Sequence, residues 1–453
     1  MVSRRHATLL KRRAVYGKVA FMMEMPCRHR PSLSMIRRIF CSALFITLTA
    51  SAEPLHWYKG NTHTHTLWSD GNDFPDMVTD WYRTHGYNFL GLSDHNILQA
   101  KEVWMAEAAV EKRRKALGKT TMEKYRTRFG SPWVEERETD GQMEVRLKKL
   151  EEYRPLFEKS GEFLLVQAEE ISAQFQKSPI HIGAVNVAEV ITPITGSSIA
   201  DVIRANLRAV MDQEQRLGRP MITHVNHPNF RWSLTAEDMA QVAEEKFFEV
   251  YNGHPSIHHL GDADRVGDEA IWDIANTLRL TQFKTPPLMG VATDDSHHYH
   301  GEDGSPGRGW IMVQAEKLEA GALIGAMRAG RFYASSGATL DEIEFHDGTL
   351  HLRIHEEPGV TYATRIVGTP KDYDASTTEA PMPADDFHKT RTRYSSDVGK
   401  TFATAAGPEV QYKLTGKELY IRAVITSSKP HPNPSFAGQT EEAWTQPVGW
   451  ELH

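Results

Sequence analysis

The chain has 453 residues, of which 40% are hydrophobic and 25% charged, and its formal net charge is −7. This length exceeds that of one typical domain and the composition is globular, so we expect two domains with a sizeable core. Proteins bind the backbone of nucleic acid through Lys and Arg, so this acidic balance argues against a nucleic-acid partner.

The first 52 residues differ in composition from the rest of the chain. They carry ten Lys or Arg and one acidic residue, and an apolar run extends from Ile39 to Ala50. The run is too short to span a bilayer but has the length of a signal-peptide core. Met35-Ile36-Arg37-Arg38 supplies a basic start, and Ala50-Ser51-Ala52 supplies a small-residue cleavage site.

We therefore predict a signal peptide over about residues 35–52, cleavage after Ala52, and a periplasmic or secreted protein. Translation is then expected to begin at Met35, with residues 1–34 as an upstream extension. The alternative for this region is an amphipathic or buried N-terminal helix.

Cleavage would change the charge and the thiol content of the chain. Removing ten basic residues and one acidic residue leaves 42 basic and 58 acidic residues, a net charge of −16. Cys27 and Cys41 both lie in the removed segment, which excludes disulfides, Cys nucleophiles and Cys-ligated zinc from the mature chain. No later apolar run reaches roughly 18 residues, so we expect no membrane span in the mature chain.

Short apolar runs alternate with amphipathic stretches from Trp57 to about Ala315, which predicts an α/β, barrel-like fold. The expected strands are 58–65, 88–93, 163–168, 181–187, 220–226, 247–251 and 288–293. Residues that can bind metal stand at the carboxyl ends of most of these runs. In α/β barrels that end carries the active site.

A long, charge-rich insertion occupies about residues 96–162. Its periodicity is helical, notably over 101–108 and 142–159, with interruptions at Gly118, Gly130 and Pro132. Pro155 should kink or restart the second helix. The position of the insertion beside the metal-binding motifs makes it a candidate lid, and a solvated, charged helix face is the alternative.

Two further helices and a change of pattern follow. Thr235-Ala236-Glu237-Asp238 should cap a helix, and a helix over 316–329 should end at Gly330. From Leu340 the pattern alternates, as in 349–354 and 418–425, with turns at Asp347-Gly348 and Thr415-Gly416. We expect a small β-sandwich-like accessory domain here, interrupted by a polar loop over 370–396.

The stretch His63-Thr64-His65-Thr66-Leu67-Trp68-Ser69-Asp70-Gly71 suggests a metal site, because alternate residues of a strand face the same side. Alone, a His-x-His pair can equally be an exposed strand edge. Similar motifs recur after apolar runs: Ser93-Asp94-His95, Glu169-Glu170-Ile171-Ser172, His181-Ile182-Gly183, His224-Val225-Asn226-His227-Pro228 and Thr293-Asp294-Asp295-Ser296-His297. This recurrence favours a metal site.

In this order the motifs resemble those of the PHP (polymerase and histidinol phosphatase) family of metal-dependent hydrolases, over roughly Trp57 to His300. Phe248-Glu249-Val250-Tyr251-Asn252-Gly253 and Gly330-Arg331-Phe332-Tyr333-Ala334-Ser335 look like the branch of that family that contains carbaryl hydrolases. The PHP resemblance implies a distorted (β/α)7 barrel. We expect it to occupy residues 53–337, and the C-terminal β-rich domain to occupy 338–453.

The resemblance also implies two or three divalent metal ions per chain and a ligand at nine positions. His63 and His65 would hold a first ion with Glu170 and Asp295. Glu170 would bridge to a second ion held by His181 and a histidine of the 224–228 motif, and Asp70, His95 and His297 would hold a third. Glu170, Asp295 and His297 are the predicted catalytic residues. Imidazole and carboxylate ligands without thiolate suit Zn, Mn or Fe.

Three choices between neighbouring residues are open from spacing alone. The resemblance favours His227 over His224 because Pro228 follows it, Glu170 over Glu169 because Ile-Ser follows it, and Asp295 over Asp294 because of its spacing to His297. Asp94 and Asp294 are then expected to orient imidazoles. The remaining candidates for a supporting role or a substrate contact are Glu169, His224, Asn252, Arg331 and Tyr333; for Arg331 and Tyr333 the alternative is packing in the core.

These observations favour a metal-dependent hydrolase of small-molecule phosphate esters that uses a metal-bound hydroxide shared by two or three ions. A carboxylic or carbamate ester hydrolase of the carbaryl-hydrolase type is the alternative within enzymes. A metal- or carbohydrate-binding module without catalysis is the alternative of another class.

Overall fold

The computed structural model describes residues 54–114, 118–384 and 386–452. The predicted signal peptide, its cleavage site after Ala52 and both cysteines lie outside these residues. Within the described ranges, no helix is long and apolar enough to cross a membrane.

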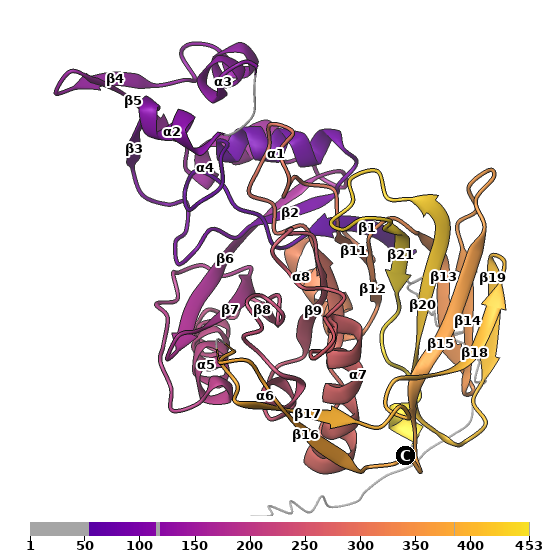
Figure 1. Cartoon of the computed structure of the whole chain (residues 1–453). Coiled ribbons are helices and arrows are strands. Elements are labelled where there is room, and N and C mark those ends of the chain that lie inside the picture. Colours follow the sequence, from indigo (N-terminus) through magenta and orange to yellow (C-terminus); the bar gives the residue numbers. More distant parts are fainter. Residues whose placement is uncertain (1–53, 115–117, 385, 453) are drawn as a thin grey trace, which may run out of the picture. The chain divides into compact units, whose positions relative to one another are not determined.

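One 13-stranded sheet runs through the molecule in the order β10-β9-β8-β7-β6-β2-β1-β11-β12-β21-β20-β15-β18 (Figure 1). Its first seven strands in this order overlap the strands expected from the sequence, although the first along the chain ends at Asn61, so that His63 and His65 follow it. They are β1 (His56–Asn61), β2 (Phe89–Leu92), β6 (Leu164–Phe175), β7 (Ser178–Val185), β8 (Ile222–Val225), β9 (Phe247–Asn252) and β10 (Met289–Thr293). The α/β class is therefore confirmed.

Most of these seven strands run in the same direction. The pairs β1–β2, β2–β6, β8–β9 and β9–β10 are parallel, while β7 is antiparallel to β6 and to β8. Beyond the ends of β1 and β10, Thr64 and Ser296 form a parallel bridge. The His65 amide donates to the Ser296 carbonyl at 3.0 Å, and the Asp295 amide donates to the His63 carbonyl at 3.0 Å. The first and the last of the seven strands thus meet at their carboxyl ends.

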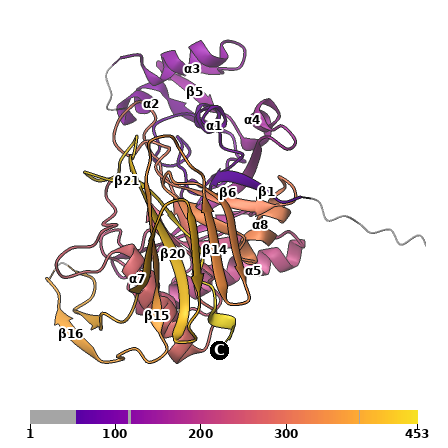
Figure 2. The same ribbon diagram turned by 90° about the vertical axis from the view of Figure 1, so that its right-hand side faces the viewer.

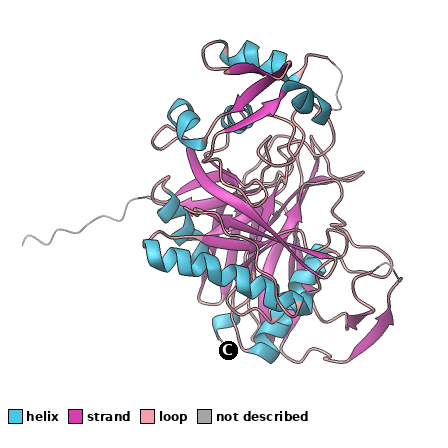
Figure 3. Cartoon of the chain, turned by 90° about the vertical axis from the view of Figure 1, so that its left-hand side faces the viewer, coloured by secondary structure: helices cyan, strands magenta, loops and turns pink. Residues whose placement is uncertain are grey.

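Helices lie along the outside of the strands (Figure 3). They are α1 (Pro75–Thr84), α5 (Ile199–Leu217), α6 (Ala236–Ala240), α7 (Asp268–Leu278) with the π-helical turn η1 (Arg279–Phe283), and α8 (Ala320–Arg328). In α5 the buried residues recur every three or four positions, as in Ile199, Ile203, Leu207 and Val210, so that one face packs on the sheet.

Two helix signals in the sequence are confirmed. The Thr235 side chain accepts from the Asp238 amide and the Asp238 side chain accepts from the Thr235 amide, which is the capping box expected at the start of α6. Gly330, with a φ of +72°, follows the end of α8 and takes the left-handed conformation that glycine tolerates best.

The insertion between β2 and β6 mixes strands and helices, so the expectation of a helical insertion is wrong for part of its length. It contains the antiparallel sheet β3-β5-β4, built from β3 (Val103–Ala106), β5 (Gln142–Leu147) and β4 (Glu136–Thr139). Its helices are α2 (Glu107–Arg113), α3 (Thr121–Phe129) and α4 (Leu150–Phe157). Residues 142–147 pair with strands on both sides, and this pairing outweighs their local helical pattern. Pro155 lies inside α4.

The strands after the seven-stranded part continue the same sheet (Figure 2). They are β11 (Trp310–Ala315), β12 (Phe332–Ser335), β21 (Thr440–Trp444), β20 (Glu418–Pro430), β15 (Tyr362–Pro370) and β18 (Lys400–Ala406). A second sheet contains β13 (Leu340–His346), β14 (Thr349–Ile354) and β19 (Glu409–Lys413). Leu352 of the second sheet shares a hydrophobic cluster with Ile366 and Ile421 of the first. A division into domains at residue 337 stays a prediction.

The loop expected over 370–396 contains a two-stranded ribbon, β16 (Thr377–Pro381) and β17 (Thr390–Tyr394). The short 3₁₀ turn η2 (Trp450–Leu452) ends the described chain. A buried ion pair ties α7 to β20, because the Arg422 guanidinium reaches both oxygens of Asp273 at 2.9 and 2.7 Å. This bidentate geometry fixes the C-terminal strands against the helix.

Candidate metal centre

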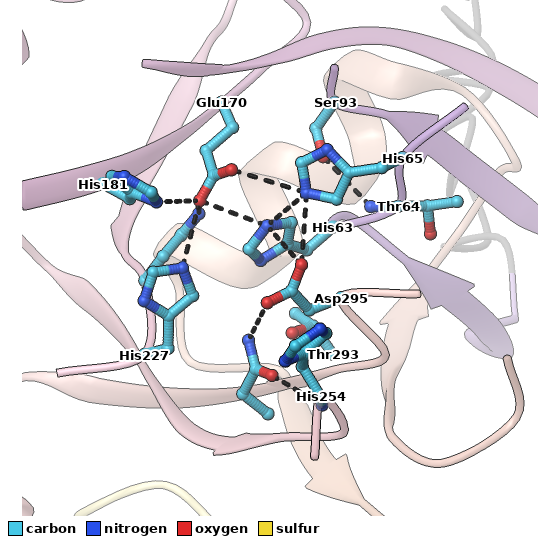
Figure 4. Close-up of polar contacts among 12 residues, drawn as sticks. His63, Thr64, His65, Ser93, Glu170, His181, His227, His254, Thr293 and Asp295 are labelled. Carbon is cyan, nitrogen blue, oxygen red and sulfur yellow. Dashed lines mark hydrogen bonds and ion pairs between the residues drawn. The ribbon is translucent and has the colours of Figure 1, made fainter. Parts of the chain in front are cut away.

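All nine predicted ligands lie together at the carboxyl ends of the parallel strands. Figure 4 shows six of them: His63, His65, Glu170, His181, His227 and Asp295. The antiparallel β7 begins at the same end, which brings His181 opposite Ser172 of β6. The nine are His63, His65, Asp70, His95, Glu170, His181, His227, Asp295 and His297. In four overlapping sets of three or four of these residues, the potential ligand atoms all lie within 4.8 Å of one another. The ligands of the three predicted ions are called the first, second and third group.

The first group surrounds one point between β1, β6 and β10. The two Nε2 atoms of His63 and His65 lie 3.1 Å apart, and Asp295 Oδ1 lies 3.2 and 3.1 Å from them. Glu170 completes the group, with Oε1 3.2 Å from His63 Nε2 and Oε2 3.4 Å from His65 Nε2. Ligands bound to one zinc at about 2.0–2.1 Å stand about 3.3 Å apart in a tetrahedron. The spacing therefore fits one cation.

Hydrogen bonds on the far side of each ring decide where its proton lies. His63 Nδ1 lies 2.7 Å from the Glu249 carboxylate, so this nitrogen donates and Nε2 of the neutral ring keeps a lone pair. Ser69 Oγ donates to Asp94 at 2.6 Å and thus accepts from His65 Nδ1 at 3.2 Å. Two lone pairs and two carboxylates then face one another, an arrangement that requires positive charge at its centre.

A second group is built on Glu170 Oε1. His181 Nδ1 and His227 Nε2 lie 3.1 and 3.2 Å from this oxygen, and Asn226 Nδ2 donates to it at 2.8 Å. Glu170 Oε2, His181 Nδ1 and Asp295 Oδ1 are buried and have polar neighbours at 2.8 to 3.1 Å, but the geometry of these contacts is not that of a hydrogen bond. Buried polar atoms of native proteins are normally paired, so these three atoms point to ligands that bind there.

The third group lies nearer the surface. Asp70 Oδ1 is 3.2 Å from His297 Nε2, and Asp70 Oδ2 is 3.5 Å from His95 Nε2. His297 Nδ1 faces the carbonyl oxygen of Asp295 at 2.9 Å, which leaves Nε2 free to bind a cation when the ring is neutral. His65 Nδ1 lies 3.6 Å from Asp70, so this group adjoins the first.

The titration behaviour of the groups shows the same demand for positive charge. Burial by itself raises the pKa of Glu170, but the imidazoles of His63, His181 and His95 outweigh it and hold that pKa well below its usual range. Burial likewise lowers the pKa of His63, and the surrounding carboxylates, led by Asp295, outweigh it and raise that pKa well above the usual value. The buried carboxylates therefore stay ionised and attract a proton or a cation.

Two of the predicted ligands have strained backbones. The φ angles of His227 and Asp295 are +25° and +47°, a region that residues with a side chain rarely adopt. Such strain is retained where the surrounding structure holds a side chain for function. At both positions it turns the chain immediately after a strand and directs a ligand into the groups described above.

The structure places the two members of each pair of neighbouring candidates in different surroundings. Glu169 faces away from the groups, where its Oε1 accepts from the Ile191 amide at 2.6 Å, and burial raises its pKa to about 7. His224 is buried beside Thr62, and its pKa is lowered to about 4 by burial. Glu170 and His227, by contrast, lie in the groups. Their role as ligands stays a prediction.

Neither Asp94 nor Asp294 pairs directly with an imidazole, contrary to the expectation from the sequence, although Asp94 acts on His65 through Ser69. Asp94 accepts from the Thr66 amide at 2.8 Å and from Ser69 Oγ, and so shapes the turn after His65. Asp294 accepts from the amides of Arg308 and Gly309 at 2.6 and 2.8 Å. The reason is that both strand-end carboxylates face backbone amides of neighbouring loops, which are the nearest unpaired donors.

Arg331 and Tyr333 are not brought to the cluster. Arg331 is exposed and directly precedes β12. It lies level with the beginning of β1, at the end of the sheet opposite to the cluster. Tyr333 is buried, packs on Trp57 with ring centres 5.1 Å apart, and accepts from the Leu340 amide at 2.8 Å. Asn252 does lie at the site, where its Nδ2 donates to Asp295 Oδ2 at 3.1 Å and to Glu249 at 2.8 Å.

Sequence reasoning missed Glu249, which lies directly beneath the first group. Besides His63, its carboxylate accepts from the His227 amide at 2.7 Å and from Thr293 Oγ1 at 2.7 Å. It thereby links the segments that follow β1 and β8 with the end of β10. A signal was available, since Glu249 is the single acidic residue inside the apolar run Phe247–Tyr251.

Comparisons with known proteins give distant likenesses. No family model and no curated protein matches the sequence. Among solved structures, a two-domain protein from Bacteroides vulgatus that contains a predicted PHP-like metal-dependent phosphoesterase is 14% identical, with 86% of this chain and 95% of that chain covered and a TM-score of 0.36. PsfC from Pseudomonas syringae is 12% identical over 57% of this chain and 82% of its own, with a TM-score of 0.29.

An amidohydrolase from Chromobacterium violaceum, with bound sulfate and no metal, is 14% identical over 54% of this chain and 89% of its own, with a TM-score of 0.26.

Proposed function

We propose that the protein is a metal-dependent hydrolase of phosphate esters. The observation that carries this proposal is the convergence of His63 Nε2, His65 Nε2, Glu170 and Asp295 Oδ1 at separations of 3.1 to 3.4 Å, without a donor among them once both rings are neutral. Nitrogen and carboxylate oxygen without sulfur are the ligands that suit Zn, Mn or Fe.

The chain offers positions for three ions. His63, His65, Glu170 and Asp295 would hold the first, Glu170 with His181 and His227 the second, and Asp70, His95 and His297 the third. When bound, such ions polarise an ester oxygen and lower the pKa of water at the site. The resemblance of the motifs to the PHP family favours phosphate esters as the substrate class, and seven strands in a distorted barrel as the fold that carries the site.

The residues around the ligands have definite tasks in this proposal. Glu249 fixes the ring of His63, and Ser69 fixes that of His65, so that both rings present Nε2. Asn226 donates to Glu170, and Asn252 donates to both Asp295 and Glu249, which holds these carboxylates in their rotamers. The ligands are therefore positioned before any ion binds, which limits reorganisation during catalysis.

His254 supplies a hydrogen-bond donor at the edge of the site. Its Nδ1 lies 3.2 Å from the Ser256 amide and 2.7 Å from Ser256 Oγ. A backbone amide can only donate, so Nδ1 accepts and Nε2 carries the proton. The ring lies 4.9 Å from that of His297 and close to Asp295 (Figure 4). It is thus placed to donate to an oxygen of a substrate rather than to bind an ion.

The test joins metal analysis to an ester panel. Protein freed of metal and reloaded with Zn, Mn or Fe is assayed against aryl phosphate monoesters, aryl phosphate diesters and aryl carboxylic and carbamate esters. We expect at least two bound ions per chain and turnover of a phosphate ester that depends on them. Turnover confined to carboxylic or carbamate esters would replace the substrate class. Bound metal without turnover on the whole panel would favour a binding module instead.

A further inference from the structure

Asp70 differs from the other eight predicted ligands in its exposure. Its side chain is 56% exposed, whereas the most exposed of the others, His95, reaches 27%. It also stands in a turn, outside any strand or helix. Burial and strand pairing therefore do not fix Asp70, and its position depends on what holds the turn.

The turn packs tightly against the end of β1 on one side. The Ser69 amide donates to the Thr66 carbonyl at 3.1 Å. A Cβ atom at Gly71 would lie 2.7 Å from the backbone of His65 and Thr66, so this position accepts only glycine without displacement of the chain. The carbonyl groups of Ser69 and Gly71, which flank Asp70, point the other way, towards the insertion.

Arg113, the last residue of α2, meets these carbonyl groups. Its Nη1 donates to Ser69 O at 2.6 Å and to Gly71 O at 3.0 Å, and Leu67 O lies at 3.5 Å. One guanidinium group therefore brackets Asp70 from both sides. Arg113 is held in turn because α2 buries Val110 in a cluster that includes Leu67 of the turn.

Other residues of the insertion bind the same region. Trp68 Nε1 donates to the Lys148 carbonyl at 3.2 Å, just after β5. Tyr125 and Trp133 both donate to Asp76 Oδ2, at 2.9 and 2.6 Å, at the start of α1. The insertion thus holds the segment that carries Asp70, and the ligands centred on Glu170 are held by the strands of the sheet.

We propose that Arg113 is a positioning residue for Asp70, and that through it the insertion controls the occupancy of the ion site made by Asp70, His95 and His297. This inference rests on the proposed function, because it concerns one of the three ion positions. The ions held by Glu170 have no ligand in the turn. Ser69 reaches His65 through its Oγ atom, whereas Arg113 binds the Ser69 carbonyl group, so we expect these ions to remain when Arg113 is replaced. The insertion is then part of the metal centre rather than a separate lid.

The test compares four full-length variants with the wild type by metal analysis after reloading and dialysis, and by titration with the same metal. In R113M the affinity for one ion should fall about 10- to 100-fold, the range found when a group that orients a ligand is removed, and the other ions should remain. D70N should lose the same ion, and the double variant should lose no more than D70N. R137M is the matched control, because Arg137 is an exposed arginine of the same insertion that pairs with Glu144 at 2.7 Å.

Each outcome bears on the inference separately from the proposed function. An R113M protein that binds metal as the wild type does, or that loses all ions together, would overturn the role of Arg113. If R113M does not fold, R113Q is measured instead. Its shorter side chain cannot reach the carbonyl groups of Ser69 and Gly71, and wild-type metal binding by a folded R113Q would count equally against the role of Arg113. A wild type that binds no divalent ion would contradict the proposed function itself.

Discussion

At the scale of single residues, Glu170 and Glu169 form a matched pair for testing the site. Glu170 touches His63, His95, His181 and His227, whereas Glu169 next to it accepts from the Ile191 amide in the core. E170Q removes the charge and one of two coordinating oxygens, so we expect metal content to fall and ester turnover to fall by at least about 100-fold.

E169Q should keep its metal and most of its rate, because the amide oxygen can still accept from Ile191 and the burial of Glu169 already favours an uncharged group. Metal content and turnover are measured on both variants. Equal, small losses in the two would remove Glu170 from the site, and a collapse only in E169Q would mean that the assignment is wrong by one residue.

Glu249 gives a second prediction at this scale. In E249Q one side of the new amide can still accept from His63 Nδ1, but its NH₂ group would face the His227 amide and Asn252 Nδ2, which are both donors. We expect metal affinity to fall about 10- to 100-fold, because the ring of His63 and the turn at His227 lose their support. Metal titration measures this change, and an E249Q protein with wild-type affinity would show that the carboxylate beneath the site is dispensable.

At the scale of elements, Glu245 just before β9 predicts a pH dependence of stability. It is buried at the opposite end of the strand from Glu249, accepts from Thr223 Oγ1 at 3.0 Å and from the Phe247 amide at 3.0 Å, and burial raises its pKa to about 7. The folded protein then holds this proton more tightly than the unfolded chain. The stability that protonated Glu245 contributes is therefore lost as the pH rises from the pKa of this group in the unfolded chain through its folded pKa of about 7.

E245Q removes this titration while keeping a similar shape. The free energy of unfolding of E245Q minus that of the wild type should increase by about 2 kcal/mol from about pH 5 to about pH 8. Urea unfolding at both pH values measures the difference, and metal content serves as a control that should not change. A difference between the two proteins that is independent of pH would contradict the buried titration.

The insertion shows how packing between elements changes a local pattern. Its charge-rich sequence has helical periodicity over 142–159, but β5 (Gln142–Leu147) pairs with β3 and β4, and only α4 (Leu150–Phe157) is helical. Val145 and Leu147 are fully buried in the cluster beneath this small sheet. The pairing partners lie up to about forty residues away, so a local pattern does not contain them.

At the scale of the whole molecule, the metal centre should contribute to stability. The carboxylates of Glu170, Asp295 and Asp70 come from separate parts of the chain and meet at a partly buried site. When the ions are removed, these negative charges lose the cations that bind them together, and the imidazoles must take up protons to replace the lost positive charge. Chelation should therefore lower the melting temperature by roughly 5 °C or more and abolish turnover. Calorimetry before and after exhaustive chelation measures this, and unchanged stability and activity after loss of the ions would refute the site.

The N-terminal segment yields a prediction about the exported chain. A basic start, a short apolar core and Ala50-Ser51-Ala52 predict that the mature protein begins at Glu53. Sequencing the N-terminus of protein recovered from the periplasm or the medium checks this. Recovery of Met1, or of any residue before Met35, from such material would refute the predicted signal peptide.

The amino-acid sequence by itself determined the seven strands, the helix ends at Thr235 and Gly330, and the ligand types that gather at the site. These features are local: hydrophobic period, capping residues and His or carboxylate motifs directly after apolar runs can all be recognised within a short window. Only the tertiary structure decided that β7 runs antiparallel, that Glu249 supports His63 and that Arg113 holds the turn of Asp70. The last two depend on contacts between residues about 40 to 190 positions apart, and the antiparallel course of β7 depends also on its pairing with β8, about 40 positions away. The free energy of such contacts comes from burial and hydrogen bonding across elements, which no local pattern encodes.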